Sequence, residues 1–480
     1  MTLNPYTYYR QLIAGFILAL TFTQASGQAA HKLDSLFETM NRQGSINGTV
    51  LIAEDGKPIY KKAFGYADFA TKRLNDNNTV FELASVSKQF TSMAIMQLHQ
   101  NHKINYNERV VKYLPQFPYS VITIDNLLHH TSGLPEFISW GEKQIDVNRI
   151  NNNADILASL KKNVPMLNFI PGTSLSYSNT NYALLALIVE KVSGESFGQY
   201  LAKHIFKPLG MTHTQVYMQR APNPKIKNFA FGHVYDPGKN TFIINDSLVS
   251  NRFLYYLDGV AGPYGISSNT EDLLKWDQAL YTEKLVTKAE QELAYTPSNL
   301  NSGHVAKFEG MPYGFGWLLP EPKNYTGKIY MHSGGYPGYM TLIVRYPEKK
   351  KTIILLTNTW AVINIYELWG VIERILFNKS FYIPKASPVR RAISLNAAQL
   401  KTVEGNYTII AGNKIMITTR AGQAYAQLTG RPKFEVYPES DSTFFYTALD
   451  GKLKFKKDSV GKVTKVELLQ PGITLRASKD

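Results

Sequence analysis

The chain has 480 residues, of which 44% are hydrophobic and 19% charged, a globular composition with enough length for two domains. Its formal net charge of +15 favours anionic partners. The basic residues are spread along the chain and form no nucleic-acid-binding motif, so we expect no nucleic-acid partner. The absence of cysteine excludes disulfides, thiolate metal sites, a cysteine nucleophile and a lipid anchor on cysteine.

Residues 1–27 have the layout of a secretory signal peptide. Arg10 precedes the apolar run Leu12–Phe22, and Ala25 and Gly27 are the small residues expected before a cleavage site. The apolar run is short for a membrane span. We therefore expect cleavage after Gly27, a periplasmic or secreted protein and no stable membrane span after cleavage. An uncleaved membrane anchor is the alternative.

The hydrophobic pattern of residues 28–385 predicts a mixed domain of helices and strands. Strand-like runs occur near both ends of this region, and the part from about residue 81 to residue 310 is mainly helical or loop-like. This order predicts one antiparallel sheet flanked by helices, with an inserted helical subdomain beside it. The predicted strands are 49–53, 58–64, 327–331, 339–345 and 352–357, and helices are predicted at 31–42 and 363–377.

A second domain is predicted at the C-terminal end. Pro384, Pro388 and the pair Arg390-Arg391 indicate a linker over residues 386–395. Residues 396–480 then read as about seven short strands separated by turns at Ala411-Gly, Asp450-Gly and Pro471-Gly. Such a pattern predicts a small all-β, barrel-like domain.

The pattern Ser-x-x-Lys occurs at Ser85–Lys88, Ser159–Lys162 and Ser459–Lys462. Only Ser85–Lys88 precedes a run with very little charge, residues 89–98, which is typical of a buried helix. Residues three apart share one face of a helix, and a helix N-terminus favours developing negative charge. We therefore predict that Ser85 is a nucleophile activated by Lys88. A plain helix cap is the alternative role of Ser85.

Two further motifs follow the serine–lysine pair along the chain. Tyr177-Ser-Asn179 precedes a predicted helix over 182–192, and His332-Ser-Gly-Gly335 follows the strand predicted to end at Met331. In this order the three motifs resemble the serine β-lactamase and penicillin-recognising superfamily. The resemblance covers residues 31–380 and is closest to class C β-lactamases and related D-alanyl-D-alanine carboxypeptidases and esterases. Similar segments also lie at 127–135, 262–268 and 313–317.

The resemblance implies a β-lactamase/transpeptidase-like fold and an acyl-enzyme on Ser85. Lys88 would stabilise the alkoxide and help to accept its proton, and Tyr177 would act as general base and protonate the leaving group. How Lys88 and Tyr177 share that proton is left open by the sequence. Asn179 would contact the substrate amide and hold Lys88. The backbone N–H groups of Ser85 and Gly335 would form the oxyanion hole.

His332 and Ser333 are the remaining residues that the resemblance assigns to substrate binding. Class C β-lactamases carry lysine where this chain has His332. A histidine, with an ordinary pKa of about 6.5, is only partly charged at neutral pH and suits a substrate carboxylate less well. The difference favours a peptide, amide or ester over a β-lactam as the natural substrate.

The sequence thus predicts an active-site-serine hydrolase, with D-alanyl-D-alanine carboxypeptidase-like or related peptidase activity as the leading hypothesis. β-Lactamase and esterase are alternatives, and a non-hydrolytic penicillin-binding sensor is the alternative of another class. The expected partners are small peptide, amide, ester or β-lactam substrates, including cell-wall peptide. The chemistry requires no metal or cofactor.

Two other groups of residues in these segments receive an expectation. His129 and His130 are expected to be structural, because neighbouring side chains diverge and no third metal ligand stands out. For Tyr313 and Trp317 the sequence leaves open whether they form core or cleft wall.

Overall fold

The computed structural model describes residues 27–138, 144–222, 224–359, 364–385, 390–410, 413–429, 433–447, 451–470 and 473–480. The predicted signal segment up to residue 26 lies outside these residues. So do the first part of the predicted linker, 386–389, and the predicted turns at 411–412, 450 and 471–472. Among the described residues, no helix combines the length and apolar character that crossing a membrane requires.

A five-stranded antiparallel sheet joins the two ends of the first domain, with strand order β12-β13-β14-β1-β2. The central contact pairs β1 with β14, for example Gly48 with Thr357, and β12 forms one edge, whose Met331 also bridges to Leu318. This confirms the predicted sheet with strands from both ends of the domain. Its strands are β1 (Gly48–Glu54), β2 (Lys57–Phe64), β12 (Tyr330–Tyr336), β13 (Tyr339–Tyr346) and β14 (Lys351–Thr357).

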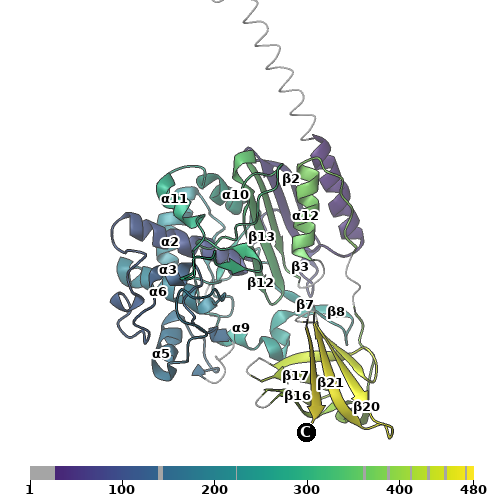
Figure 1. Ribbon diagram of the computed structural model, residues 1–480. Helices are drawn as coiled ribbons and strands as arrows, with labels where there is room; N and C mark the ends of the chain where they lie inside the picture. The colour runs from purple at the N-terminus through teal and green to yellow at the C-terminus, as the bar shows by residue number, and fades with distance from the viewer. Residues whose placement is uncertain are drawn as a thin grey trace, which may run out of the picture.

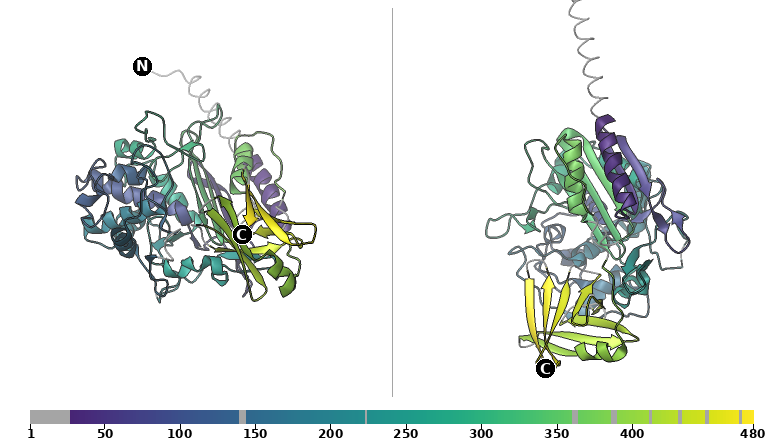
Figure 2. Two further views of the ribbon diagram at one scale, coloured as in Figure 1. Left: turned by 60° about the horizontal axis from the view of Figure 1, so that its bottom comes forward. Right: turned by 90° about the vertical axis from the view of Figure 1, so that its right-hand side faces the viewer.

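Both faces of this sheet are covered. In β1, Val50 and Ile52 pack under the helix of residues 27–42 and under α12 (Ile365–Leu376), whereas Leu51 packs on the opposite side against the helical region. The strand is therefore a continuous apolar run, as expected for a strand buried on two faces. Figure 2 shows the two covering helices side by side over one face of the sheet.

The helical region comes between the early and late sheet strands along the chain, lies beside the sheet in space (Figure 1) and forms the predicted inserted subdomain. Its buried helices α2 (Lys88–Gln100) and α6 (Asn179–Ser193) pack against each other. The other helices are α3 (Ile124–Leu128), α5 (Asn153–Asn163), α7 (Phe197–Leu201), α8 (Lys207–Leu209), α9 (Phe253–Tyr256), α10 (Thr270–Ala279) and α11 (Lys288–Ala294). Short strands are β3 (Tyr66–Asp68), β4 (Arg73–Leu74), β5 (Phe81–Glu82), β6 (Gln215–Val216), β7 (His233–Asp236), β8 (Thr241–Ile244), β9 (Ile266–Ser268), β10 (Lys307–Phe308) and β11 (Met311–Pro312).

The C-terminal region is a closed antiparallel barrel of eight strands, which confirms the predicted barrel-like fold. A short helix, α13 (Ala397–Val403), precedes it. The strands are β15 (Gly405–Ile410), β16 (Asn413–Arg420), β17 (Gln423–Leu428), β18 (Lys433–Pro438), β19 (Thr443–Tyr446), β20 (Lys452–Lys457), β21 (Val463–Gln470) and β22 (Ile473–Lys479).

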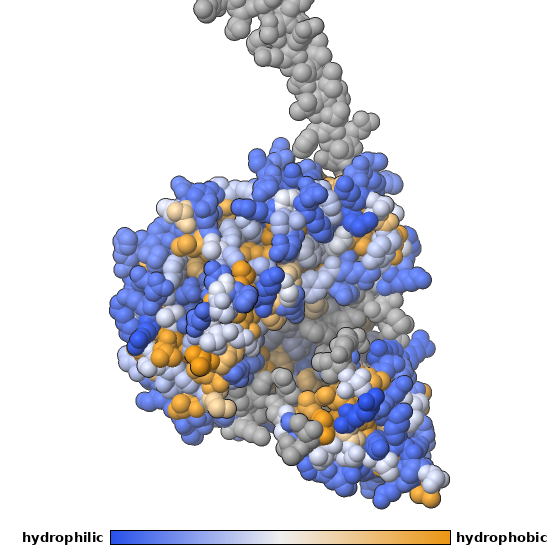
Figure 3. Space-filling model, in the orientation of Figure 1, coloured by the Kyte–Doolittle hydropathy of each residue, from blue (hydrophilic) through white to orange (hydrophobic). Residues whose placement is uncertain are grey.

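The barrel docks on the first domain through β18. Val436 points into the barrel core, whereas its neighbour Glu435 points outward and is nevertheless only 5% exposed. The Glu435 carboxylate accepts hydrogen bonds from the backbone N–H groups of Val249 at 2.7 Å and Ser250 at 3.3 Å, at the start of the turn η5 (Val249–Asn251). On the face seen in Figure 3, hydrophilic residues predominate and hydrophobic residues form smaller patches.

Candidate active site

Ser85 lies in a single 3₁₀ turn, η1 (Ala84–Ser87), which runs directly into α2. The turn begins with an unusual backbone, because Ala84 has a φ of +50°. Lys88, the first residue of α2, is fully buried. Its Nζ atom lies 3.1 Å from the Ser85 hydroxyl oxygen, so the two residues do share one face of the helical segment.

Lys88 has two further polar partners, both of which are carbonyl oxygens. Its Nζ donates to Asn179 Oδ1 at 2.8 Å and to the backbone oxygen of Pro263 at 2.9 Å. Burial lowers the pKa of Lys88 well below its ordinary value, which favours the neutral amine. A neutral amine has two N–H donors and one lone pair. Since both carbonyl oxygens can only accept, they would take the two N–H donors of the neutral amine, and its lone pair would then face the hydroxyl of Ser85.

Tyr177 lies beside this pair, with Lys88 Nζ 4.7 Å from the centre of its ring. Its hydroxyl is buried and makes no hydrogen bond of standard geometry within the described residues. Burial raises the pKa of Tyr177 well above 10, and the nearby Ser85 hydroxyl lowers it by a smaller amount. A general base of this kind would need a nearby cation to lower its pKa or to share its proton. Lys88 does not supply that charge, because its amine lies over the ring and burial favours its neutral form.

The β12 edge of the sheet reaches the nucleophile turn through a glycine. A Cβ atom on Gly334 would lie 2.3 Å from the backbone oxygen of Leu83 and 3.1 Å from the Cβ of Ala84. The same Leu83 oxygen accepts a hydrogen bond from Thr341 Oγ1 at 2.7 Å. Strand β12 can therefore approach η1 only without a side chain at this position, and exposed Gly335 follows it on the edge.

The motif that begins at His332 lies within strand β12, whereas the sequence predicted that the strand would end at Met331. His332 pairs with Ile343 of β13, and this pairing continues through Gly335. Strand pairing with β13 uses only backbone N–H and C=O groups, so it continues through Gly334 and Gly335. The close approach to η1 requires a glycine at position 334. The strand signal in the sequence was weak here because serine and glycine are uncommon in strands.

His332 is a buried, neutral side chain in this arrangement. Burial, with a smaller effect of Lys88, lowers its pKa to about 3. Its Nδ1–H donates to the backbone oxygen of Ser333 at 2.6 Å, so Nε2 is left to accept from the Tyr313 hydroxyl at 2.9 Å. The partly charged histidine expected from the sequence is therefore absent. Tyr313, whose role the sequence left open, is a buried residue that orients His332.

Three contacts to the site residues were not anticipated from the sequence. The backbone oxygen of Pro263 accepts from Lys88, and the hydroxyl of Tyr366 lies 2.8 Å from Ser333 Oγ. The Glu136 carboxylate accepts from the backbone N–H of Asn179 at 2.7 Å. Pro263 lies within the family-like segment 262–268 and Glu136 directly follows the segment 127–135, but neither belongs to one of the three motifs. Tyr366 lies after those segments, and no motif in the sequence indicated a role for it.

The two neighbouring histidines have protein partners. His129 Nδ1 lies 3.0 Å from Asp125 Oδ1, and its Nε2 lies 3.2 Å from the backbone oxygen of Thr296. His130 Nδ1 accepts from the backbone N–H of Ser178 at 3.2 Å, and its ring centre lies 4.3 Å from that of Tyr177. His130 therefore supports the position of the tyrosine. Within the described residues, no cluster of histidine, aspartate or glutamate side chains is arranged to hold a metal.

The other two Ser-x-x-Lys pairs and Trp317 lie outside the candidate site. Ser159 bonds to the backbone oxygen of Gln144 and Lys162 is exposed on α5. Ser459 and Lys462 are exposed in a turn between barrel strands. Trp317 is 3% exposed and belongs to the core of the helical region.

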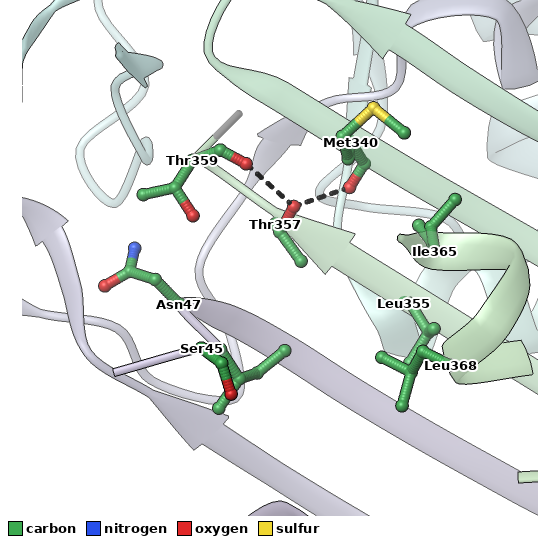
Figure 4. Close-up of a pocket in the computed structure, with 9 residues that line it drawn as sticks. Ser45, Asn47, Met340, Leu355, Thr357, Thr359, Ile365 and Leu368 are labelled. Carbon is green, nitrogen blue, oxygen red and sulfur yellow. Dashed lines mark hydrogen bonds between the residues drawn. The ribbon is translucent and has the colours of Figure 1, made fainter. Parts of the chain in front are cut away.

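A small pocket lies between the sheet and the start of α12 (Figure 4). Ser45, Asn47, Met340 and Thr357 are among the residues that line it. Its volume of about 10 Å³ has room for roughly one water molecule. The pocket is therefore too small to accept a substrate, and it does not contain the Ser85–Lys88 pair.

Comparison with known proteins agrees with this geometry. Residues 33–365 match the Beta-lactamase family. The chain is 37% identical over 424 residues to a penicillin-binding protein of Bacillus subtilis strain 168, covering 88% of this chain and 93% of the relative. The solved structure of a penicillin-binding protein from Bacillus halodurans is 25% identical, with a TM-score of 0.60 over 71% of this chain and 98% of that protein.

A second solved structure extends the likeness in fold to almost the whole chain. The octameric penicillin-binding protein homologue from Pyrococcus abyssi is 24% identical, with a TM-score of 0.62 over 93% of this chain and 99% of that protein. The resemblance inferred from the three sequence motifs is confirmed. The chain belongs to the Beta-lactamase family.

Proposed function

We propose that this protein is an active-site-serine hydrolase that cleaves a peptide, amide or ester through an acyl-enzyme on Ser85. The observation that carries the proposal is the position of Lys88. Its amine has two carbonyl acceptors and the Ser85 hydroxyl within hydrogen-bonding distance, and burial favours its neutral form. This arrangement leaves a lone pair beside the serine proton, which is what activation of a serine requires.

The proposed acylation assigns a step to each of the three side chains Ser85, Lys88 and Tyr177. Lys88 accepts the Ser85 proton while the serine oxygen attacks the substrate carbonyl carbon. The backbone N–H groups of Ser85 and Gly335 stabilise the oxyanion, and such a donor is typically worth about 10²–10³ in rate. Tyr177, which burial keeps protonated, gives its proton to the leaving group and regains one from Lys88. Water then hydrolyses the acyl-enzyme by the reverse proton path.

The substrate class is proposed from the charge of the site. D-alanyl-D-alanine carboxypeptidase-like or related peptidase activity is the leading hypothesis, with amide and ester hydrolysis close to it. The neutral state of buried His332 removes a cation that would attract a substrate carboxylate, which supports amide and ester hydrolysis over hydrolysis of a β-lactam that carries a carboxylate.

Export is part of the proposal. The support is the signal-like layout of residues 1–27. N-terminal sequencing of protein recovered outside the cytoplasm should begin at Gln28. Recovery with the cytoplasmic fraction, or with residues 1–27 intact in a membrane fraction, would contradict it.

Labelling by a fluorophosphonate probe tests the nucleophile. We expect the native protein and the Ser159→Ala variant to be labelled and the Ser85→Ala variant to remain unlabelled. Ser159 is the matched control because it belongs to another Ser-x-x-Lys pair and has ordinary structural contacts. Labelling of Ser85→Ala would show that the nucleophile is a different residue.

Intact-mass measurement after penicillin treatment separates an enzyme from a sensor. We expect a penicilloyl adduct on Ser85 that disappears with time, together with hydrolysis of at least one D-amino peptide, amide or ester. A permanent adduct without any such hydrolysis would favour the non-hydrolytic sensor.

A further inference from the structure

Three polar side chains form a chain of hydrogen bonds at the border of the site. Ser333 Oγ on β12 lies 2.8 Å from the hydroxyl of Tyr366, which stands in the first turn of α12. The Tyr366 hydroxyl donates in turn to Glu309 Oε2 at 3.4 Å, in the exposed turn between β10 and β11. Phe308, which precedes Glu309 at the end of β10, stacks on Tyr177, with ring centres 4.8 Å apart. The chain therefore ends beside the catalytic tyrosine.

The direction of these hydrogen bonds follows from the last acceptor. An ionised Glu309 has no proton to donate, so the Tyr366 hydroxyl gives its proton to that carboxylate. The Tyr366 oxygen is then left as acceptor for the proton of Ser333. A serine hydroxyl has a single proton. Ser333 therefore presents only lone pairs to a substrate, and these suit an N–H donor.

The charges around Ser333 also disfavour a substrate carboxylate at this position. Within the described residues, the hydrogen-bond partners of Ser333, Tyr366 and His332 are hydroxyls, a backbone oxygen, the side-chain amide oxygen of Asn364 and the Glu309 carboxylate. Burial keeps His332 neutral. A free substrate carboxylate at Ser333 would thus meet no donor from the serine, no cation among these groups and the negative charge of Glu309.

We propose that Tyr366 and Glu309 are specificity-determining residues, which make Ser333 an acceptor and select a leaving group with an uncharged N–H donor, such as a terminal carboxamide, over one with a free carboxylate. The inference rests on the proposed function, because it concerns the leaving-group end of the same serine site. It narrows the leading hypothesis from a carboxypeptidase that needs a free C-terminus to a peptidase or amidase that does not.

Three matched substrates test this preference. They are an N-acylated D-alanyl-D-alanine with a free acid, a methyl ester or a carboxamide at its C-terminus, compared by kcat/KM for cleavage of the D-Ala–D-Ala bond. We expect the carboxamide to be fastest, the ester intermediate and the free acid slowest. One gained hydrogen bond predicts a carboxamide-to-ester ratio between about 2 and about 12. Equal rates, or a faster free acid, overturn the inference.

Protection of Ser85 from the fluorophosphonate probe gives a second readout that does not require turnover. The carboxamide dipeptide should protect at a lower concentration than the free acid. Failure of both the carboxamide and the free acid to be cleaved and to protect also counts against the inference. Loss of labelling at Ser85 itself would instead refute the proposed function, so the two failures are distinguishable.

Variants locate the cause of the preference. Tyr366→Phe removes the acceptor of the Ser333 proton and Glu309→Gln removes the charge, so in both the carboxamide-to-acid ratio should fall toward one. The matched control is Tyr382→Phe, which deletes an exposed hydroxyl that bonds only to Glu367 among the described residues. Because the ratio compares two substrates on one preparation, partial loss of folded protein does not affect it. An unchanged carboxamide-to-acid ratio in Tyr366→Phe and Glu309→Gln would show that Tyr366 and Glu309 do not determine the specificity.

Discussion

Burial favours the neutral forms of both Lys88 and Tyr177 in the candidate site. Lys88 is fully buried with two carbonyl acceptors, and Tyr177 has a buried hydroxyl whose pKa is raised. The same desolvation therefore favours a neutral base and a neutral acid, side by side. A pair of this kind needs no ion pair in its resting state.

The pH dependence of acylation should report Lys88. For a chromogenic short-chain ester, kcat/KM should rise with pH as Lys88 loses its proton, with a midpoint well below the ordinary 10.5 of lysine. Tyr177→Phe should lower the rate by about 10²-fold, as expected for loss of a general acid, yet leave the midpoint in place. Disappearance of the limb in this variant would instead assign it to the tyrosine.

Glu82 links stability to pH at the nucleophile turn. Its carboxyl accepts from the backbone N–H groups of Ala84 at 3.1 Å and Gly265 at 2.9 Å, and burial raises its pKa from 4.5 to about 8. A raised pKa means that the folded state holds the proton more tightly. The stability is therefore present below about pH 4.5 and is lost as pH rises through about 8.

Glu82→Gln keeps the acceptor oxygen but cannot ionise, so it should lack this pH-dependent loss. Urea unfolding at pH 5 and pH 9 measures the effect. Between these values the native protein should lose more than about 1 kcal/mol relative to the variant. Parallel losses in the two proteins would show that the pKa of Glu82 is not raised in the folded state.

The sequence identified the residues of this site that belong to short motifs, and missed those that act through the fold. Ser85 and Lys88 are three residues apart, and local spacing was enough to pair them. Tyr366 meets Ser333, and Pro263 meets Lys88, only after distant segments pack together. The sequence could not predict the neutral state of His332 either, because that state depends on burial and not on residue type.

At the scale of elements, the junction of β12 with η1 determines the geometry of the proposed oxyanion hole. Gly334→Ala would bring a Cβ atom within 2.3 Å of the Leu83 backbone oxygen and 2.2 Å of Thr341 Oγ1. The strand must then move away from Ser85. We expect kcat/KM to fall by about 10²-fold or more, the worth of an oxyanion donor.

Gly370→Ala is the control for that substitution. Gly370 lies within α12 and has open space around its Cβ position. Alanine should therefore raise the free energy of unfolding by about 0.5–1 kcal/mol through helix propensity, with unchanged catalysis. Similar activity in both variants would mean that the approach of β12 does not limit acylation.

Apolar periodicity placed most of the sheet strands close to their observed positions, but it shifted β12. In β14 the run from Lys351 to Thr357 is apolar and was readily predicted. In β12 the functional residues His332, Ser333 and Gly334 replace the apolar pattern, so the prediction ended the strand too early. An element that carries chemistry gives the weakest structural signal in its own sequence.

At the scale of the whole molecule, Glu435 joins the barrel to the first domain. Glu435→Ala leaves the backbone N–H groups of Val249 and Ser250 without their acceptor in a buried contact. The free energy of unfolding should fall by about 1–3 kcal/mol. Trypsin should also cut sooner at Arg390-Arg391, between the two domains.

Glu439→Ala provides the comparison on the same side of the barrel. Glu439 is exposed and pairs with Lys452, so its loss should change stability by less than about 0.5 kcal/mol. Equal effects of the two substitutions would indicate that Glu435 contributes no more than a surface pair. The sequence predicted the barrel from its turns, but this contact had no signal because outward positions of a barrel are usually exposed.

The pairing of β1 with β14 also sets the order of events during synthesis. The first sheet strand is made early, yet its partner contains Thr357 and emerges only after the whole helical region. A chain that ends before residue 351 would contain Ser85, Lys88, Tyr177 and Gly335 but lack the strand that joins β13 to β1. Such non-local pairing is slow to form. The sheet can therefore close only after β14 has been made, so a nascent chain holds all the residues of the candidate site before it holds the fold that brings them together.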